Sequence, residues 1–333
     1  MMRFLLILTP FLLLNACGME HERNFMFLEG FTQGTSYHIA YRSSDSVDYH
    51  QDIREIFKEI DFSMSTYNPG SLISAINRNE EGVEPDDYFR DVFNRALEIS
   101  ALTEGAFDIT VAPLVNAWGF GFTEPENVTP PDIDSILQFV GWEKVKLDNN
   151  RIVKEHGEMM LNMNAIAKGY TVDVVADFFD RKGVSDYMVE VGGEIRTKGR
   201  NRDNRLWRIG IDKPVDDPAA LSRDLQEVLH LTGKALATSG NYRRFYIKDG
   251  QRFAHTISPV TGYPVQHNLL SATVIASTCM DADAFATAFM VMGLEKSMQF
   301  TLENNDLEAY FIYDLNGISA VASTPGIEDM IRR

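Results

Sequence analysis

Asp283 and Thr287 have residue types and a spacing that could hold a metal ion. They lie in residues 282–288, which follow a β-branched strand pattern and have the composition of a helix. Residues four apart in a helix share one face, so this carboxylate and hydroxyl would point toward one place. Two hard oxygen donors suit Mg²⁺, which keeps water or substrate phosphate at its other positions. In the alternative, Asp283 is a first-turn acid that complements the helix dipole, and Thr287 is a tolerated polar residue.

The charge of the chain sets a condition on any phosphate ligand. The formal net charge is −17, which argues against nucleic acid or an anionic lipid surface as a partner. A phosphate would therefore need a metal or a local positive cluster. Residues 164–170 open a helical pattern, and its free N–H groups with Lys168 form a candidate anion site. Arg243 and Arg244 follow a small-residue turn and form a second candidate, although solvated side chains are the alternative in both places.

The N-terminus has the pattern of an export signal. Residues 1–3 are short and positive, and residues 4–14 form an apolar run that is too short for a permanent membrane-spanning helix. The sequence Leu-Asn-Ala-Cys at 14–17 resembles a bacterial lipobox, in which Cys17 becomes the lipidated first residue. Several acyl chains on one residue give a stable membrane anchor. An ordinary signal peptide followed by an unrelated cysteine is the alternative.

We therefore expect an exported lipoprotein that faces the periplasm from the inner membrane. Residues 1–16 would be the signal peptide and residues 17–26 a lipid-anchored tether. Cys279 then has no disulfide partner, so the exported domain must depend on its core. About 310 residues follow the signal, and 44% of the chain is apolar, which is enough for a large core.

The remaining pattern predicts an α/β (α+β) fold with a largely antiparallel sheet. Helical periodicity covers residues 49–62, 86–102, 132–140 and 164–181. Strand patterns cover residues 31–41, 144–147, 187–197, 207–211, 227–231, 235–238, 245–248, 271–277 and 307–313. Several strands follow one another between residues 187 and 277 without a helix, which favours antiparallel pairing over a doubly wound parallel sheet. The common glycine-rich nucleotide motifs and zinc motifs are absent.

Eight motifs occur in the order seen in one protein family. They are GTSY (34–37), MSTYN (64–68), GAFDITVAPLVNAWGFG (105–121), NAIAKGY (164–170), EVGGEI (190–195), ATSGNY (237–242), HTISPVTGYPV (255–265) and DADAFAT (281–287). With these motifs, the chain resembles the ApbE lipoproteins, the FAD:protein FMN transferases, from about residue 27 to residue 325. The resemblance makes residues 27–333 the catalytic domain.

The resemblance implies a T-fold-like architecture, with FAD in a cleft and Mg²⁺ at its pyrophosphate. Such an enzyme would move FMN from FAD onto a threonine hydroxyl of an acceptor flavoprotein and release AMP. The acceptors in the family are membrane subunits of Nqr-type sodium-pumping NADH:quinone reductases and of Rnf-type complexes. Two other activities remain open at this point: a Mg²⁺-dependent FAD pyrophosphatase that gives FMN and AMP, and a non-enzymatic flavin-binding lipoprotein.

Site residues follow from the same resemblance. It implies that the metal is held by Asp283, Thr287 and the main-chain carbonyl of Ala165. The implied FAD contacts are Gln33, Tyr67, Ala106, Phe107, Asp108, Asn162, Lys168 and Ile257. Three of these depart from some family members, which have Met at position 33, Asp at 162 and Glu at 168.

His255 is the candidate base for the acceptor threonine. The ordinary pKa of a histidine lies near neutrality, which suits acceptance of a proton from a hydroxyl. His255 also lies in a segment rich in glycine and proline, where functional side chains are common. A structural loop histidine is the alternative. With Asp283 at the metal, His255 completes the predicted catalytic residues.

Overall fold

The computed structural model describes residues 24–43, 45–121, 132–214, 224–241, 245–248 and 251–331. Cys17 lies outside the described residues, as do the rest of the predicted signal peptide and most of the tether. Arg243 and Arg244 also lie outside them. No helix in the described part of the chain is long and apolar enough to cross a membrane.

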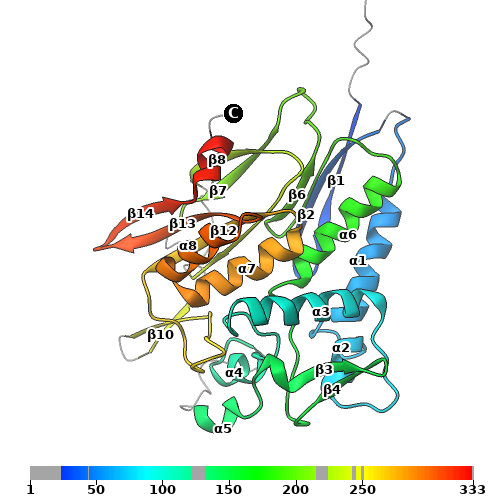
Figure 1. The fold of residues 1–333 in the computed structure, drawn as a ribbon. Coiled ribbons are helices and arrows are strands. Elements are labelled where there is room, and N and C mark those ends of the chain that lie inside the picture. The colour runs from blue at the N-terminus through cyan, green and yellow to red at the C-terminus, as the bar shows by residue number, and fades with distance from the viewer. Residues whose placement is uncertain are drawn as a thin grey trace, which may run out of the picture.

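A large antiparallel sheet forms the centre of the described fold (Figure 1). Its eight strands lie in the spatial order β1-β2-β5-β6-β9-β12-β13-β14, and each pairs antiparallel with its neighbours. The strands are β1 (Phe25–Thr32), β2 (Thr35–Arg42), β5 (Tyr187–Val191), β6 (Glu194–Lys198), β9 (Ala235–Gly240), β12 (Leu269–Ala276), β13 (Glu308–Leu315) and β14 (Ile318–Ser323). The predicted mixed fold with a largely antiparallel sheet is confirmed.

Two predicted strands are in fact hairpins. The predicted strand at 31–41 reverses at Gln33 and Gly34, where φ is 49° and 73°. The predicted strand at 187–197 reverses at Gly192 and Gly193, where φ is 66° and 104°. The predictions were wrong because a two-residue turn interrupts the alternation of side chains too briefly to be seen in the pattern.

Three smaller hairpins lie outside the central sheet. They pair β3 (Val145–Asp148) with β4 (Arg151–Lys154), β7 (Trp207–Asp212) with β8 (Leu225–Leu231), and β10 (Phe245–Lys248) with β11 (Gln251–Ala254). The predicted strands near 144–147, 207–211, 227–231 and 245–248 are confirmed. The strands β4, β11 and β14 were not predicted, and neither were residues 25–30 of β1.

Helices other than α9 cover one face of the sheet and build the part of the molecule below it in Figure 1, whereas α9 packs with β8 and β13. They are α1 (His50–Met64), α2 (Leu72–Asn77), α3 (Asp87–Leu102), α4 (Ala112–Ala117), α5 (Ile133–Leu137), η2 (Trp142–Lys144), α6 (Ala167–Arg181), α7 (Cys279–Met292), α8 (Leu294–Glu303) and α9 (Pro325–Ile331). The long predicted helices are confirmed as α1, α3 and α6. The helix predicted at 132–140 is shorter, because the chain turns before Gly141, whose φ is 142°.

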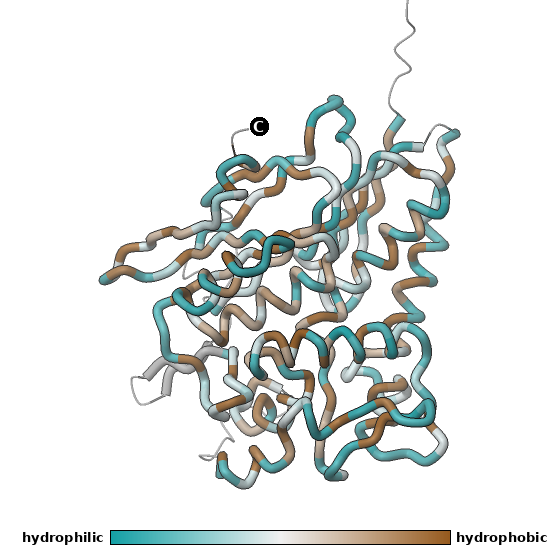
Figure 2. Tube along the Cα trace, in the orientation of Figure 1, coloured by the Kyte–Doolittle hydropathy of each residue, from teal (hydrophilic) through white to brown (hydrophobic). Residues whose placement is uncertain are grey.

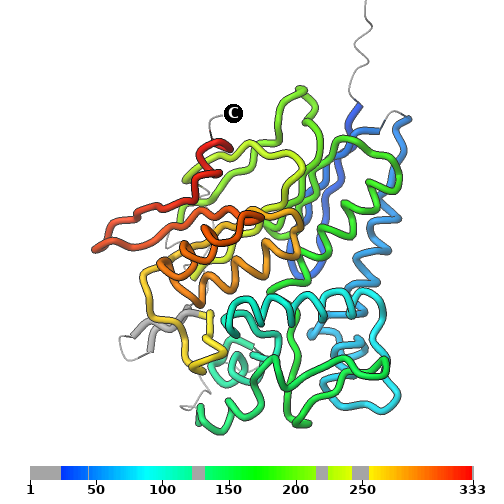
Figure 3. Tube along the Cα trace, in the orientation of Figure 1, coloured from blue at the N-terminus to red at the C-terminus, as the bar shows by residue number. Residues whose placement is uncertain are grey.

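The path of the chain brings distant segments together (Figure 3). The helix α7 packs on α6, β9 and β12, so a helix from the C-terminal third of the chain covers strands in the middle of the sheet. Figure 2 shows that α7 is mostly hydrophobic, whereas α1 alternates between hydrophobic and hydrophilic residues. A helix that is apolar on most sides must be buried, and α1 needs only one buried face.

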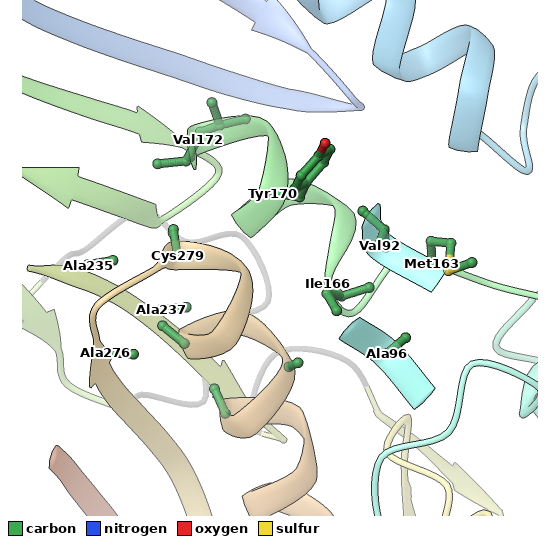
Figure 4. Close-up of a cluster of buried hydrophobic side chains, with 14 of the residues drawn as sticks. Val92, Ala96, Met163, Ile166, Tyr170, Val172, Ala235, Ala237, Ala276 and Cys279 are labelled. Atoms are coloured by element: carbon green, nitrogen blue, oxygen red, sulfur yellow. The ribbon is translucent and has the colours of Figure 1, made fainter. Parts of the chain in front are cut away.

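The main core fills the space between the helices and the sheet. Figure 4 shows Tyr170 and Val172 of α6, Cys279 of α7 and Ala237 of β9 within one buried cluster. A second cluster covers the opposite face of the sheet, where Trp207 and its neighbours on β7 and β8 pack against the sheet. A small third cluster joins α4, α5 and the segment around Ile257. The candidate site residues therefore rest on the main core and on the third cluster.

Candidate functional site

The α6–α7 crossing positions Asp283. The main-chain N–H of Gly169 donates a 3.0 Å hydrogen bond to Oδ2 of Asp283. A Cβ added to Gly169 would lie 2.3 Å from the carbonyl oxygen of Cys279, so only glycine permits this approach. From α6, the Asp173 carboxylate also accepts hydrogen bonds from the first two main-chain N–H groups of α7, those of Cys279 and Met280, at 2.9 and 2.8 Å. These bonds fix the start of α7 against α6.

Asp283 is not a first-turn acid of its helix. The helix α7 begins at Cys279, after the N-cap Thr278, and the acidic residue of its first turn is Asp281. That carboxylate accepts a 2.7 Å hydrogen bond from Nε of Arg95 on α3. Asp281, and not Asp283, is therefore the acid that complements the helix dipole in the first turn. The presence of the Asp283 carboxylate requires another explanation.

Asp283 is a buried carboxylate with spare coordination capacity. Its side chain is almost completely buried, and burial raises its pKa, against the opposing effects of Lys168 and of the Gly169 hydrogen bond. The hydrogen bond from the Gly169 N–H goes to Oδ2 of this carboxylate, and within the described residues it is the one assigned to it. One turn later, the Oγ1 of Thr287 lies 3.2 Å from the Oγ of Ser239 on β9. The carboxylate and hydroxyl thus lie on one stretch of α7, as their spacing predicts.

These donors fit a magnesium ion. Removing an ionised carboxylate from water costs free energy unless a cation offsets its charge. Mg²⁺ can do so with few protein oxygens, because water or phosphate oxygens complete its coordination shell. Ala165, the predicted carbonyl ligand, lies two residues before α6, four residues from Gly169. The described residues hold no cluster of three or more histidine, cysteine or acidic side chains arranged for a metal. The predicted magnesium ligands include one carboxylate, that of Asp283, together with a hydroxyl and a main-chain carbonyl.

Lys168 lies in a network of buried charges at the same crossing. Its ammonium forms an ion pair with Oε1 of Glu194, the first residue of β6. Burial would lower the pKa of Lys168, but the carboxylates of Asp283 and Glu194 outweigh it and hold the pKa above its ordinary value. Burial raises the pKa of Glu194 to about 7, with Lys168 acting in the opposite direction. Lys168 is thus a cation held between two carboxylates.

Sequence reasoning missed Glu194. It was part of the EVGGEI motif, but no residue type or spacing connected it with Lys168, which is 26 residues away. Its side chain is only 6% exposed, and a buried acid is a stronger functional signal than an exposed one. The position of Glu194 within the EVGGEI motif was the sequence signal that could have identified it.

The predicted contact Gln33 lies on the same side of α6. It occupies the β1–β2 turn, and its Nε2 donates a 2.7 Å hydrogen bond to Oγ1 of Thr171. Thr171 is three residues after Lys168 on α6, so the two side chains share a helix face. The structure therefore brings Gln33, Lys168 and Asp283 to the N-terminal half of α6.

Asp108 organises the loop between α3 and α4. Its Oδ1 accepts hydrogen bonds from the main-chain N–H and the hydroxyl of Thr110 at 2.7 and 2.6 Å. Its Oδ2 accepts a 2.9 Å hydrogen bond from the N–H of Trp142. Burial raises the pKa of Asp108 to about 6, and these hydrogen bonds act in the opposite direction. Both oxygens thus have partners within the protein.

The neighbouring predicted contacts are built into the same loop. Ala106 and Phe107 are buried, and Phe107 packs in the main core. The N–H of Asn162 donates a 2.8 Å hydrogen bond to the carbonyl of Ile109, which ties the segment before α6 to this loop. The Oδ1 of Asn162 accepts a 2.8 Å hydrogen bond from the N–H of Asn164.

His255 and Ile257 belong to a different packed region. Ile257 is buried against α4 and α5 and forms an isolated bridge with Pro264. The ring of His255 lies 6.4 Å from that of Phe120, centre to centre. Tyr67, in the turn after α1, is 69% exposed. The predicted residues thus form two groups, one at the α6–α7 crossing and one on the α4–α5 side, with Tyr67 on the surface.

The fold and this site define the class of protein. The structure superposes on "Flavin Transferase ApbE from Vibrio cholerae" with a TM-score of 0.83 and 36% sequence identity, covering 92% of this chain and 99% of that chain. The architecture is therefore that of a flavin transferase. The chain belongs to the ApbE family, whose model matches residues 33–311.

Two curated relatives agree with this assignment. A Vibrio cholerae protein named FAD:protein FMN transferase is 39% identical over 306 residues, which are 90% of each chain. A Haemophilus influenzae protein with the same name is 37% identical over 320 residues, covering 92% of this chain and 91% of the relative. The similarity thus extends across nearly all of the chain.

Proposed function

We propose that this protein transfers FMN from FAD to a threonine hydroxyl of an acceptor flavoprotein and releases AMP. The observation that carries the proposal is the α6–α7 crossing, where the buried carboxylate of Asp283 accepts a hydrogen bond from the N–H of Gly169 and lies beside Lys168. A carboxylate that can hold a cation, next to a lysine and a helix N-terminus, suits a pyrophosphate substrate. The match to relatives named for this activity supports the same reaction.

Mg²⁺ would be held by the Asp283 carboxylate, the Thr287 hydroxyl and the Ala165 carbonyl. When bound, it would neutralise the negative charge that develops on the pyrophosphate. Lys168 adds a second positive charge from α6, and the pairing with Glu194 restricts where its ammonium can lie. The protein thereby orients the dinucleotide with preorganised charge, which is the main requirement of phosphoryl transfer.

The transfer itself is an in-line displacement at phosphorus. The threonine oxygen of the acceptor forms a bond to the phosphorus of the FMN half. The bond from that phosphorus to the bridging oxygen breaks, and the bridging oxygen leaves with AMP. His255 accepts the threonine proton, since a neutral imidazole is a suitable base near pH 7. His255 lies outside the α6–α7 group, so it acts from the acceptor side of the site.

The proposal also covers the protein that accepts the FMN and the place of the enzyme in the cell. The acceptor is a membrane flavoprotein subunit of an Nqr- or Rnf-type complex, and Cys17 carries the lipid that anchors the protein at the periplasmic face of the inner membrane. The lipobox-like residues 14–17 support the anchor. A tethered enzyme would meet a membrane-bound acceptor at a high effective concentration.

Incubation with FAD and Mg²⁺, with and without an acceptor subunit, tests the proposal. FMN transfer predicts AMP release together with flavin fluorescence bound covalently to the acceptor. A FAD pyrophosphatase would release AMP and free FMN at the same rate without the acceptor. A protein that only binds flavin would leave FAD intact, and either of these two results would contradict the proposal.

A further inference from the structure

Two buried acceptor oxygens beside α6 have no hydrogen-bond donor among the residues that the structure describes. They are Oε1 of Gln33 and Oε2 of Glu194. Within the described residues, the remaining buried side-chain N or O atom without a partner is Nε of Arg90, on α3. Buried polar groups are nearly always paired, so two unpaired acceptors in one region indicate that a donor is bound there in the working protein.

The orientation of the Gln33 amide follows from its neighbour. The Thr171 hydroxyl donates its proton to the carbonyl of Ala167 at 2.8 Å. Its oxygen can therefore only accept from Gln33, which requires Nε2 on that side. The amide oxygen must then point away from Thr171, so a flipped amide does not remove the unpaired acceptor.

Glu194 presents its second oxygen in a similar way. Oε1 is occupied by the ammonium of Lys168. Oε2 has no hydrogen-bond partner among the described residues. The side chain is 6% exposed, which excludes bulk solvent as its usual partner.

The two acceptors belong to one region. Gln33 is held by Thr171 and Glu194 by Lys168, and these two α6 residues are three apart on one helix face. Gly192, in the β5–β6 turn, lies close both to Thr35 at the start of β2 and to Glu194. A Cβ added to Gly192 would lie 2.8 Å from Cγ2 of Thr35 and 3.2 Å from Oε2 of Glu194. The glycine leaves space between the turn and the carboxylate.

We propose that Oε2 of Glu194 and Oε1 of Gln33 form an acceptor pair that receives N–H or O–H donors of bound FAD. Glu194 then becomes a substrate-binding residue of the site. The inference rests on the proposed function in taking FAD as the ligand. Both halves of FAD carry such donors: the flavin imide and ribityl hydroxyls on one side, and the adenine amino group and ribose hydroxyls on the other. Lys168 is 30% exposed, which leaves an approach to the pair.

Titration calorimetry with FAD, FMN and ADP, without any acceptor protein, tests the pair. Glu194→Gln should weaken FAD binding about 10- to 100-fold, because it removes a charged acceptor. Gln33→Met should weaken it about 3- to 10-fold, because it removes a neutral one. If the affinity for one of the two fragments, FMN or ADP, falls in parallel with that for FAD, that fragment carries the donors.

Glu190→Gln is the matched control. It makes the same substitution on the same hairpin, but both Glu190 oxygens already have partners, the His38 ring and the Gly193 N–H, each at 2.7 Å. Its FAD affinity should stay within about twofold of wild type.

Three results would overturn the proposal. Wild-type FAD affinity in both Glu194→Gln and Gln33→Met would mean that water satisfies the two oxygens. A loss of affinity in Glu190→Gln equal to that in Glu194→Gln would indicate distortion of the hairpin. A loss confined to Glu194→Gln would indicate an effect through Lys168, which Gln33 does not contact. If the Glu194→Gln variant does not fold, the FAD affinity of Gln33→Met tests the proposal. Because no acceptor is present, failure of FMN transfer would contradict the proposed function and leave this binding test intact.

Discussion

The N–H of Gly169 donates a 3.0 Å hydrogen bond to Oδ2 of Asp283, across a helix crossing at which a side chain larger than hydrogen does not fit. The bond orients the carboxylate through its Oδ2 oxygen. The same glycine therefore serves both the packing of α6 on α7 and the aim of the predicted metal ligand.

Gly169→Ala should damage stability and activity together. The added Cβ would lie 2.3 Å from the Cys279 carbonyl oxygen and 2.8 Å from Cβ of Asp283, so the helices must separate. Overpacking of this kind costs about 1–3 kcal/mol of unfolding free energy. Thermal denaturation and FMN transfer measure the two effects. Gly157→Ala is the control, because its nearest neighbour would be a side-chain atom at 3.5 Å; equal behaviour of the two variants would contradict the packing argument.

Asp283→Ala should abolish FMN transfer and sharply weaken Mg²⁺ binding while preserving the fold. It removes the only carboxylate assigned to the ion, yet Lys168 keeps its partner Glu194 and a costly buried charge disappears. Thr287→Val keeps the shape and loses one donor, so a smaller defect is expected. Mg²⁺ titration, transfer rate and Tm are measured together. Normal Mg²⁺-dependent transfer in Asp283→Ala would refute the site.

His255→Asn should retain FAD binding and lower transfer about 100- to 10,000-fold, the usual range for general base assistance. The wild-type rate should also fall as the pH drops through the histidine pKa. Single-turnover transfer to an acceptor peptide, at saturating FAD and Mg²⁺, avoids masking by product release. If the variant matches wild type under these conditions, His255 is a structural residue of its loop.

Asp108 should make stability depend on pH. Burial raises its pKa from 3.8 to about 6, so the folded protein holds this proton more tightly than the unfolded chain does. Its contribution is therefore most favourable below about pH 4 and is lost as the pH rises through 6. Asp108→Asn lacks this titration, so the unfolding free energy of wild type minus that of the variant should fall by up to about 3 kcal/mol from pH 4 to 7.

Urea denaturation at pH 4, 5, 6 and 7 measures this difference. Asp132→Asn gives a control of opposite sign, because hydrogen bonds from Ser135 lower the pKa of the exposed Asp132. The unfolding free energy of wild type minus that of Asp132→Asn should grow as the pH rises. A flat profile for Asp108→Asn would show that the carboxyl group has an ordinary pKa in the fold.

Cys17→Ser should release the protein from membranes or block its processing, because the substitution removes the thiol that would carry the lipid. The domain itself should fold normally, since the described core begins at Phe25. Cell fractionation and N-terminal sequencing measure both effects. An unprocessed N-terminus on the wild-type protein would disprove the anchor.

Much of the fold could be predicted because its determinants are local. Helical periodicity located α1, α3 and α6. The resemblance carried by eight ordered motifs identified the family before any contact was known. The two hairpins were misread as single strands because a two-residue turn leaves the alternating pattern almost unbroken.

The sequence by itself determined the family, the antiparallel character of the sheet and the pairing of Asp283 with Thr287 on one helix, because these depend on residue order and on helical spacing. Only the tertiary structure decided which charges meet. Glu194 reaches Lys168 across 26 residues, and Gly169 reaches Asp283 across 114. Such contacts depend on how closely α6, α7 and the sheet pack, which is set by the shapes of many side chains together, so no local pattern records them.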